Sequence, residues 1–215
     1  MSPTTAVVSI LAAVLLGAMS PGPSFVMVAR NSIGLSRRDG VATALGMGIG
    51  AICFAGIALA GLYTLLATVA WLYAGLKIAG GVYLLYIASR IWRGAGQPVS
   101  MGKSETQTAD AGKSAGKSFW TGLTTQLSNP KTAVAYGSIF VALLPQHPPL
   151  WCYFALPPLV FGIETGWYTL VALSFSSQRP RDLYLRAKRW IDRVAAGAIA
   201  ALGLRLIVSA GHRGL

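Results

Sequence analysis

The chain has 215 residues, of which 54% are hydrophobic and only 11% are charged. Soluble domains carry about 25% charged residues, so this apolar content exceeds what a soluble core can bury and predicts an integral membrane protein. The formal net charge of +12 does not indicate nucleic-acid binding, because the Lys and Arg residues lie in the connections between long apolar runs. Basic residues in that position set the orientation of a protein in the membrane.

Several apolar segments approach the length of about 20 residues that a helix needs to cross the hydrocarbon core of a bilayer. They cover approximately residues 7–29, 41–69, 71–91, 119–144, 151–174 and 191–210. We therefore expect an all-α integral membrane protein with about six transmembrane helices.

Basic residues are concentrated in alternate connections of this pattern. They lie at 30–40, 90–117 and 175–193, whereas the connections around 69–70 and 145–150 contain no Lys or Arg. The positive-inside rule places the basic connections in the cytoplasm. Both termini of the chain are then predicted to lie outside.

A stretch rich in Gly, Ser, Thr, Lys and Gln, residues 94–118, predicts a flexible cytoplasmic linker. It divides a single transmembrane domain, residues 1–215, into a first repeat at 1–93 and a second repeat at 119–215. Because each half contains an odd number of predicted spans, the second half inserts upside down relative to the first. Two inverted three-helix repeats of this kind are typical of secondary transporters.

Prolines interrupt the first and fourth predicted spans. The residues at these breaks are Ser20, Pro21, Gly22, Pro23 and Ser24 in the first span, and Asn129, Pro130, Lys131 and Thr132 in the fourth. Proline lacks an N–H group and disfavours the α conformation before it, so both helices are predicted to be discontinuous near mid-membrane. Backbone left unpaired at that depth is tolerated only against protein or a wet cavity.

The second halves of the broken spans begin near Ser24 and Thr132. Their N-termini would point free N–H groups and partial positive charge toward the centre of the protein, an arrangement that suits a carboxylate. Pro-kinked helices that pack against their neighbours and bind nothing are the alternative.

Glu164 is the one acidic residue predicted to lie well inside a span. An acidic group at mid-membrane costs about 2.5–3.5 kcal/mol on insertion scales, so it usually faces a cavity and has a function. Glu164 can carry a proton or pair with an ammonium group, and a structural carboxyl bonded to a neighbouring helix is the alternative. Lys131 either binds a substrate carboxylate or extends to the cytoplasmic face.

Gly46 and Gly50 form a GxxxG motif in the second predicted span. Such a motif permits close approach of a neighbouring helix. The alternative, a phosphate-binding loop, needs aqueous access that this apolar run lacks. The motif therefore predicts helix packing.

The predicted spans contain no HExxH-like metal cluster, no cysteine pair and no Ser–His arrangement. A recognisable metal-dependent or nucleophilic active site would contain at least one of these arrangements. We therefore predict no catalytic residue, no metal and no cofactor, and a membrane-embedded enzyme is the less favoured alternative.

Short motifs occur in a characteristic order along nearly the whole chain. They are Ser20-Pro21-Gly22-Pro23, Arg30-Asn31-Ser32, Ala44-Leu45-Gly46, Lys77-Ile78-Ala79-Gly80, Asn129-Pro130-Lys131, Pro145-Gln146 and Asp192-Arg193-Val194. This series resembles the LysE/RhtB family of lysine and homoserine-threonine exporters. The resemblance implies efflux of amino acids or related solutes across the bacterial inner membrane, driven by the proton gradient, with no ATP and no prosthetic group.

One position departs from the family pattern. The family commonly has an acidic residue just after the glycine that Gly50 resembles, and this chain has Ala51 there. Glu164 occupies the comparable position in the fifth span, where the family also tends to be acidic. Because one carboxyl of the usual pair is missing, neutral amino acids are expected to suit the protein better than dibasic ones such as lysine.

The sequence as a whole predicts a secondary transporter that exports amino acids or related small metabolites by proton antiport. The predicted partners are the solute, protons and membrane lipid, with a homodimer also compatible. Glu164 is predicted to couple the proton and, with the residues of the two breaks, to bind the solute. A small-solute channel, or a carrier of another cargo, is the alternative.

Overall fold

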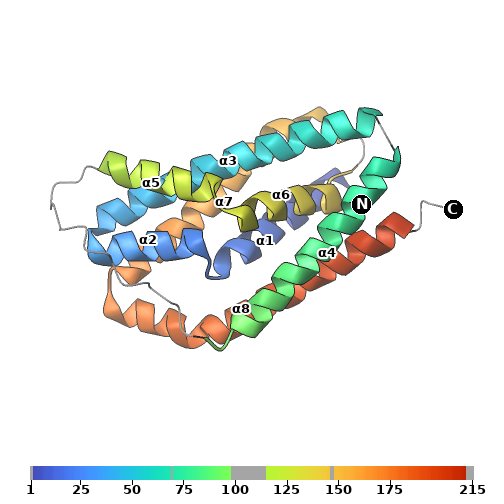
Figure 1. Cartoon of the computed structure of the whole chain (residues 1–215). Helices are drawn as coiled ribbons and strands as arrows, with labels where there is room; N and C mark the ends of the chain where they lie inside the picture. The colour runs from blue at the N-terminus through green and yellow to red at the C-terminus, as the bar shows by residue number, and fades with distance from the viewer. Residues whose placement is uncertain (1, 69, 98–114, 146–147, 212–215) are drawn as a thin grey trace.

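The computed structural model describes residues 2–68, 70–97, 115–145 and 148–211, and within them the chain forms eight helices and no strand (Figure 1). The helices are α1 (Pro3–Met19), α2 (Pro23–Gly34), α3 (Arg37–Thr68), α4 (Ala70–Gly94), α5 (Ala115–Leu127), α6 (Pro130–Leu143), α7 (Leu150–Phe175) and α8 (Gln178–Gly211). The predicted all-α class is confirmed.

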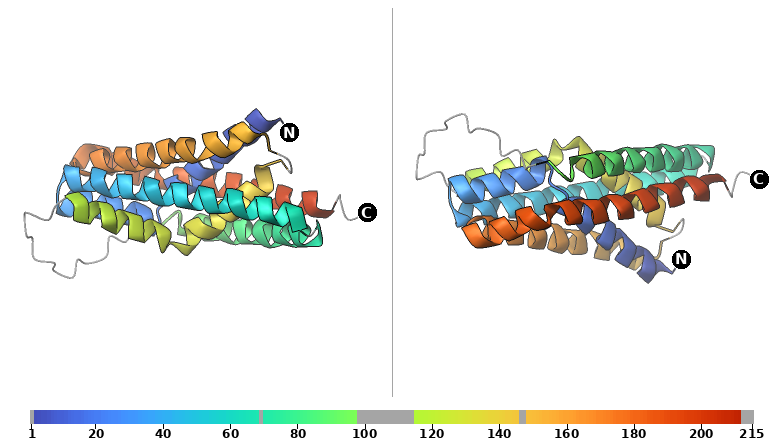
Figure 2. Two further views of the ribbon diagram at one scale, coloured as in Figure 1. Left: turned by 90° about the horizontal axis from the view of Figure 1, so that it is seen from above. Right: turned by 90° about the horizontal axis from the view of Figure 1, so that it is seen from below.

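The helices form one elongated bundle, in which α1 and α2 follow each other along the long axis and so do α5 and α6 (Figures 1 and 2). The start of α1 and the end of α8 lie at the same end of the bundle, and α2 and α5 lie at the other. The breaks of the two interrupted pairs meet near the middle. Buried apolar side chains form one cluster that includes α1 and α6 and a second cluster around α2, so the breaks lie between two apolar cores.

Both helix breaks occur where the prolines predict them. The axis bends by 58° between α1 and α2, and Pro23 is the first residue of α2. Pro130 is likewise the first residue of α6. Proline suits the first helical position, because its missing N–H would have no partner inside the helix and its fixed φ already fits.

Two helices in the described part of the chain are long and apolar enough to cross a membrane by themselves: Arg37–Gly61 within α3, and α7. The bent pair of α1 and α2 gives a third candidate if it counts as one span. The helices α5 and α6 are short, with 13 and 14 residues. The long α8 has a strongly basic first third.

The connection predicted at 175–193 is helical from Gln178 onward, so the interpretation of that stretch as a loop is wrong. Arg, Lys, Leu and Ala fill it, and these are favourable residues for a helix. In the same way, α5 begins at Ala115 and includes the end of the predicted linker at 94–118. Residues 98–114 of that linker lie outside the described residues.

Glycines bring α3 and α5 into backbone contact. A side chain added at Gly46 would overlap the carbonyl oxygen of Phe119, and one added at Gly122 would overlap that of Thr43. One helical turn further along, a side chain at Gly50 would lie 2.8 Å from the side chain of Gln126. The prediction that the GxxxG motif serves packing is confirmed.

A second pair, α4 and α8, makes a matching contact. A Cβ added at Gly81 would lie 2.7 Å from the carbonyl oxygen of Gly203, and one added at Gly203 would lie 2.8 Å from the carbonyl oxygen of Gly81. No ordinary side chain fits at such distances, so the two backbones touch. The bundle therefore contains two glycine-packed helix pairs, α3 with α5 and α4 with α8.

We predict that Gly122→Ala destabilises the protein by about 1–3 kcal/mol, because the methyl group must push α5 away from α3. The matched control is Gly137→Ala on α6, where an added Cβ meets no atom within 4 Å. Thermal unfolding of the two purified variants in detergent measures the difference. Equal midpoints would show that the α3–α5 contact tolerates a side chain.

Candidate functional site

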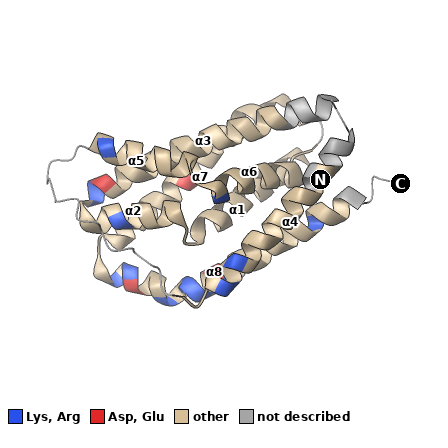
Figure 3. Cartoon of the chain, in the orientation of Figure 1, with Lys and Arg blue, Asp and Glu red and all other residues tan. Residues whose placement is uncertain are grey.

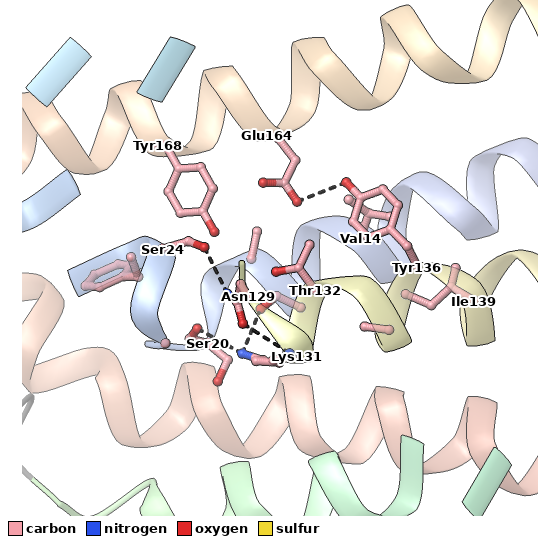
Figure 4. A pocket seen from close by; sticks show the side chains of 15 residues that line it. Val14, Ser20, Ser24, Asn129, Lys131, Thr132, Tyr136, Ile139, Glu164 and Tyr168 are labelled. Carbon is pink, nitrogen blue, oxygen red and sulfur yellow. Dashed lines mark hydrogen bonds between the residues drawn. The ribbon is translucent and has the colours of Figure 1, made fainter. Parts of the chain in front are cut away.

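Asn129 joins the two helix breaks at the centre of the bundle (Figure 4). Its Nδ2 donates to Ser24 Oγ over 3.0 Å, and its Oδ1 accepts from the backbone N–H of Lys131 over 3.1 Å. Ser24 Oγ in turn donates to Gln126 Oε1 over 2.6 Å. The start of α2 is thus tied to both ends of the break between α5 and α6.

Glu164 lies in the middle of α7 and is only 3% exposed. Tyr136 donates its hydroxyl to Glu164 Oε1 over 3.1 Å, and Gln126 Nε2 donates to Oε2 over 3.2 Å. Each carboxyl oxygen therefore has one donor, which offsets part of the penalty for burying the group. Since Gln126 also accepts from Ser24, the carboxyl of α7 belongs to the same hydrogen-bonded network as the two breaks.

A small cavity of about 40 Å³ lies beside this network and is lined by Glu164 and Tyr168 of α7 together with residues of both breaks. A volume of this order has room for about one water molecule. The predicted site residues that line it are Ser20, Gly22, Ser24, Asn129, Lys131, Thr132 and Glu164. In this conformation the carboxyl group is therefore buried beside a small cavity.

A larger cavity of about 480 Å³ lies on the other side of the breaks, against α4 and α8. The remaining predicted residues, Pro21, Pro23 and Pro130, line it, and so do Ser20, Gly22, Asn129 and Lys131. Every residue predicted for the site therefore lines one cavity or the other. The four residues common to both lie between the small cavity at Glu164 and the larger one.

Lys131 points into the break between α1 and α2. Its Nζ donates long hydrogen bonds of 3.4 Å to the carbonyl oxygens of Gly17 and Ser20. A cation at the C-terminal end of a helix is favourable, because the unpaired carbonyl groups there carry partial negative charge. In this conformation Lys131 therefore points between the two breaks, inside the bundle.

Two further side chains complete the C-terminal end of α1. Trp167 Nε1 of α7 donates to the carbonyl oxygen of Ala18 over 3.1 Å, and the Tyr184 hydroxyl of α8 donates to that of Met19 over 3.2 Å. The last carbonyl groups of a helix have no partner within the helix. Here they are satisfied by side chains from α6, α7 and α8.

The two N-termini at the breaks differ. Asn129 caps α6, and the N–H of Thr132 donates to the carbonyl oxygen of Asn129 over 3.1 Å, so the prediction of free N–H groups at Thr132 is wrong. At the start of α2, Gly22 is the N-cap and provides no side-chain cap. Ser24 and Phe25, in the first turn of α2, line the small cavity. Only the α2 terminus keeps the arrangement expected for binding a carboxylate.

The sequence analysis missed several polar residues of this region. Gln126 and Tyr136, which hold Glu164, were signalled only as polar or aromatic residues inside an apolar run. Asp192 was assigned to the edge of the last span, but it is only 2% exposed. The bundle therefore buries a second carboxyl group in addition to that of Glu164. Its partner Lys188, at 2.7 Å, was assigned to a loop.

Comparison with known proteins places the chain in a family. The family of LysE type translocators matches residues 15–210 of the chain. The threonine efflux protein of Escherichia coli (strain K12) is 32% identical over 195 residues, which cover 91% of this chain and 94% of that protein. The threonine efflux protein of Salmonella typhimurium (strain LT2) is 35% identical over 199 residues, with the same coverage of 91% and 94%.

A leucine efflux protein of Salmonella choleraesuis (strain SC-B67) is 32% identical over 129 residues, or 60% of this chain and 58% of that protein. No solved structure matches the chain. The family match covers most of the chain, and the threonine efflux proteins are similar over nearly their full length. The chain therefore belongs to the LysE type translocator family, as the motifs of its sequence indicate.

We predict that Tyr184→Phe loosens the junction of α1 and α2, because it removes one donor to the end of α1. The expected loss is about 0.5–1.5 kcal/mol, the contribution of one hydrogen bond. Amide hydrogen exchange should become faster in a peptide spanning residues 17–26. Tyr86→Phe is the control, since the Tyr86 side chain is exposed; the same change in exchange in both variants would contradict a specific role for Tyr184.

Proposed function

We propose that this protein is a secondary transporter that exports neutral amino acids, threonine or similar solutes, from the bacterial cytoplasm by proton antiport. The family match and the names of its relatives, threonine and leucine efflux proteins, support an amino acid as cargo. The observation that carries the mechanism is Glu164, enclosed and hydrogen-bonded where two broken helices meet. Intramembrane carboxyl groups in such positions are typical of proton and substrate pathways.

The proposed topology has six spans in two inverted repeats in the inner membrane, with both termini outside. The spans are α1 with α2, α3, α4, α5 with α6, α7 and α8. The two interrupted pairs meeting at mid-bundle support this arrangement, since discontinuous helices at the repeat interface are a feature of many transporters. Lys and Arg gather mostly at the end of the bundle where α2 and α5 lie, which supports that end as cytoplasmic (Figure 3).

The larger cavity reaches Gly94 and Gln97 at the C-terminal end of α4, so we interpret it as open to the cytoplasm. A solute in it meets Lys131 before it meets Glu164, because Lys131 lines both cavities. The small cavity, with room for about one water molecule, must expand to admit an amino acid. This expansion is the conformational step that the proposed mechanism requires.

In the proposed cycle, ionised Glu164 binds the α-ammonium group of the solute, and the start of α2 and Lys131 bind its carboxylate. After the site turns outward, a proton from outside binds Glu164 and displaces the solute. The net exchange is one zwitterion out for one proton in. A potential of 100 mV contributes about 2.3 kcal/mol per charge, enough for roughly 50-fold accumulation.

Uptake of labelled threonine into everted membrane vesicles tests the proposal, because their cytoplasmic face points outward. Energised vesicles that contain the protein should accumulate threonine, and a protonophore should abolish accumulation. Non-saturating flux that a protonophore does not change would indicate a channel instead. No flux of threonine, leucine or other neutral amino acids would contradict the proposed cargo.

We predict that Glu164→Gln abolishes proton-driven accumulation while the protein still inserts and folds, because the amide keeps the shape of the side chain but cannot ionise. Asp182→Asn is the matched control, since it makes the same change at an exposed carboxyl group of α8. Accumulation of labelled threonine in everted vesicles, normalised to the amount of folded protein, is the measurement. Wild-type accumulation by the Glu164 variant would remove this residue from the mechanism.

A further inference from the structure

A buried ion pair lies in the wall of the larger cavity, outside the network around Glu164. Lys188 and Asp192 of α8 are 7% and 2% exposed, and Lys188 Nζ lies 2.7 Å from Asp192 Oδ2. Lys188 also donates to the carbonyl oxygen of Gly94 over 3.0 Å. The pair therefore joins one helical turn of α8 to the C-terminal end of α4, and both of its residues line the cavity.

The pair leaves one oxygen of Asp192 without a partner. Asp192 Oδ1 is buried and accepts no hydrogen bond from the residues that the structure describes. A buried acceptor without a donor is unfavourable, and more so when the group is charged. Within the described residues Lys188 donates to Oδ2 and to the Gly94 carbonyl group but not to Oδ1, so Oδ1 can accept a hydrogen bond from a donor that another molecule supplies.

The charged groups of this cavity match both ends of a zwitterion. Asp192 supplies a carboxylate, and Arg90 and Lys131 supply cations in the lining. The guanidinium group of Arg90 lies 5.9 Å from the ring centre of Tyr86, a contact that can orient it. A volume of about 480 Å³ falls in the range of small-molecule sites, which is about 300–1,000 Å³.

We propose that this cavity is a second binding site for an α-amino acid, in which Asp192 accepts a hydrogen bond from the ammonium group and Arg90 attracts the carboxylate. Because Oδ1 is itself buried, the Asp192 carboxylate turns toward the cavity as the solute binds and keeps its contact with Lys188. The inference rests on the proposed function, since it makes the cavity the first place where an amino acid binds on the proposed export path. Lys131 then receives the carboxylate at the boundary with the site at Glu164.

The test is the number of threonine molecules that each purified protein binds at equilibrium in detergent, measured with labelled L-threonine. The wild-type protein should bind two, and the double variant Lys188→Met with Asp192→Asn should bind one. Changing both residues together leaves no unpaired buried charge, so the double variant avoids the main reason for misfolding. The control is Arg181→Met with Asp182→Asn, which changes an exposed pair on the same helix and should still bind two.

Transport gives a second measurement. The KM for threonine uptake into everted vesicles should rise about ten-fold in the Lys188/Asp192 double variant, as expected for the loss of one charge-assisted hydrogen bond. A purely structural ion pair would lower the amount of folded protein and leave KM and the binding ratio unchanged.

The possible outcomes separate the two proposals. If the wild-type protein transports threonine but binds only one molecule, or if the double variant keeps both binding and KM, the second site is overturned and the proposed function stands. If the wild-type protein neither binds nor transports any neutral amino acid, the proposed function fails and the second site fails with it. If the wild-type protein binds two threonine molecules and the Glu164→Gln variant still binds one, that remaining molecule supports the site at Asp192.

Discussion

The structure depends on a single electrostatic constraint: a carboxyl group must be accommodated in the middle of an apolar helix bundle. Within the described part of the chain no cation contacts Glu164 directly, and its two oxygens accept hydrogen bonds from an amide and a phenol. Both donors come from the interrupted pair of α5 and α6. Through Gln126 and Ser24 the same network reaches α2, so the position of each broken helix depends on one residue of α7.

A broken helix in an apolar environment also exposes backbone groups that need partners. At the end of α1 these partners are side chains from three other helices: Lys131, Trp167 and Tyr184. At the start of α6 the partner is Asn129, whereas the start of α2 has no side-chain cap. The asymmetry leaves one helix terminus with free binding capacity next to the small cavity. Such a terminus is suited to a carboxylate, because its N–H groups and the helix dipole both attract negative charge.

The sequence predicted the features that follow from local chemistry. Proline fixed the positions of both breaks, and an isolated acid in an apolar run indicated Glu164. The features it could not predict depend on how helices face one another. Gln126 and Tyr136 became partners of Glu164 only through the contact of α5 and α6 with α7, and the burial of Asp192 depends on the close contact of α8 with α4. Charge density alone made the start of α8 resemble a loop, although its residues favour a helix.

The backbone contact at Gly81 and Gly203 has a mechanical consequence. At this point no side-chain layer separates the two helices, so we expect α4 and α8 to move together as one panel. This panel forms one wall of the larger cavity, and the interrupted helices form the other. A change in the volume of that space therefore requires the α4–α8 pair to move relative to the interrupted helices, and the proline breaks before α2 and α6 are where those helices can change direction.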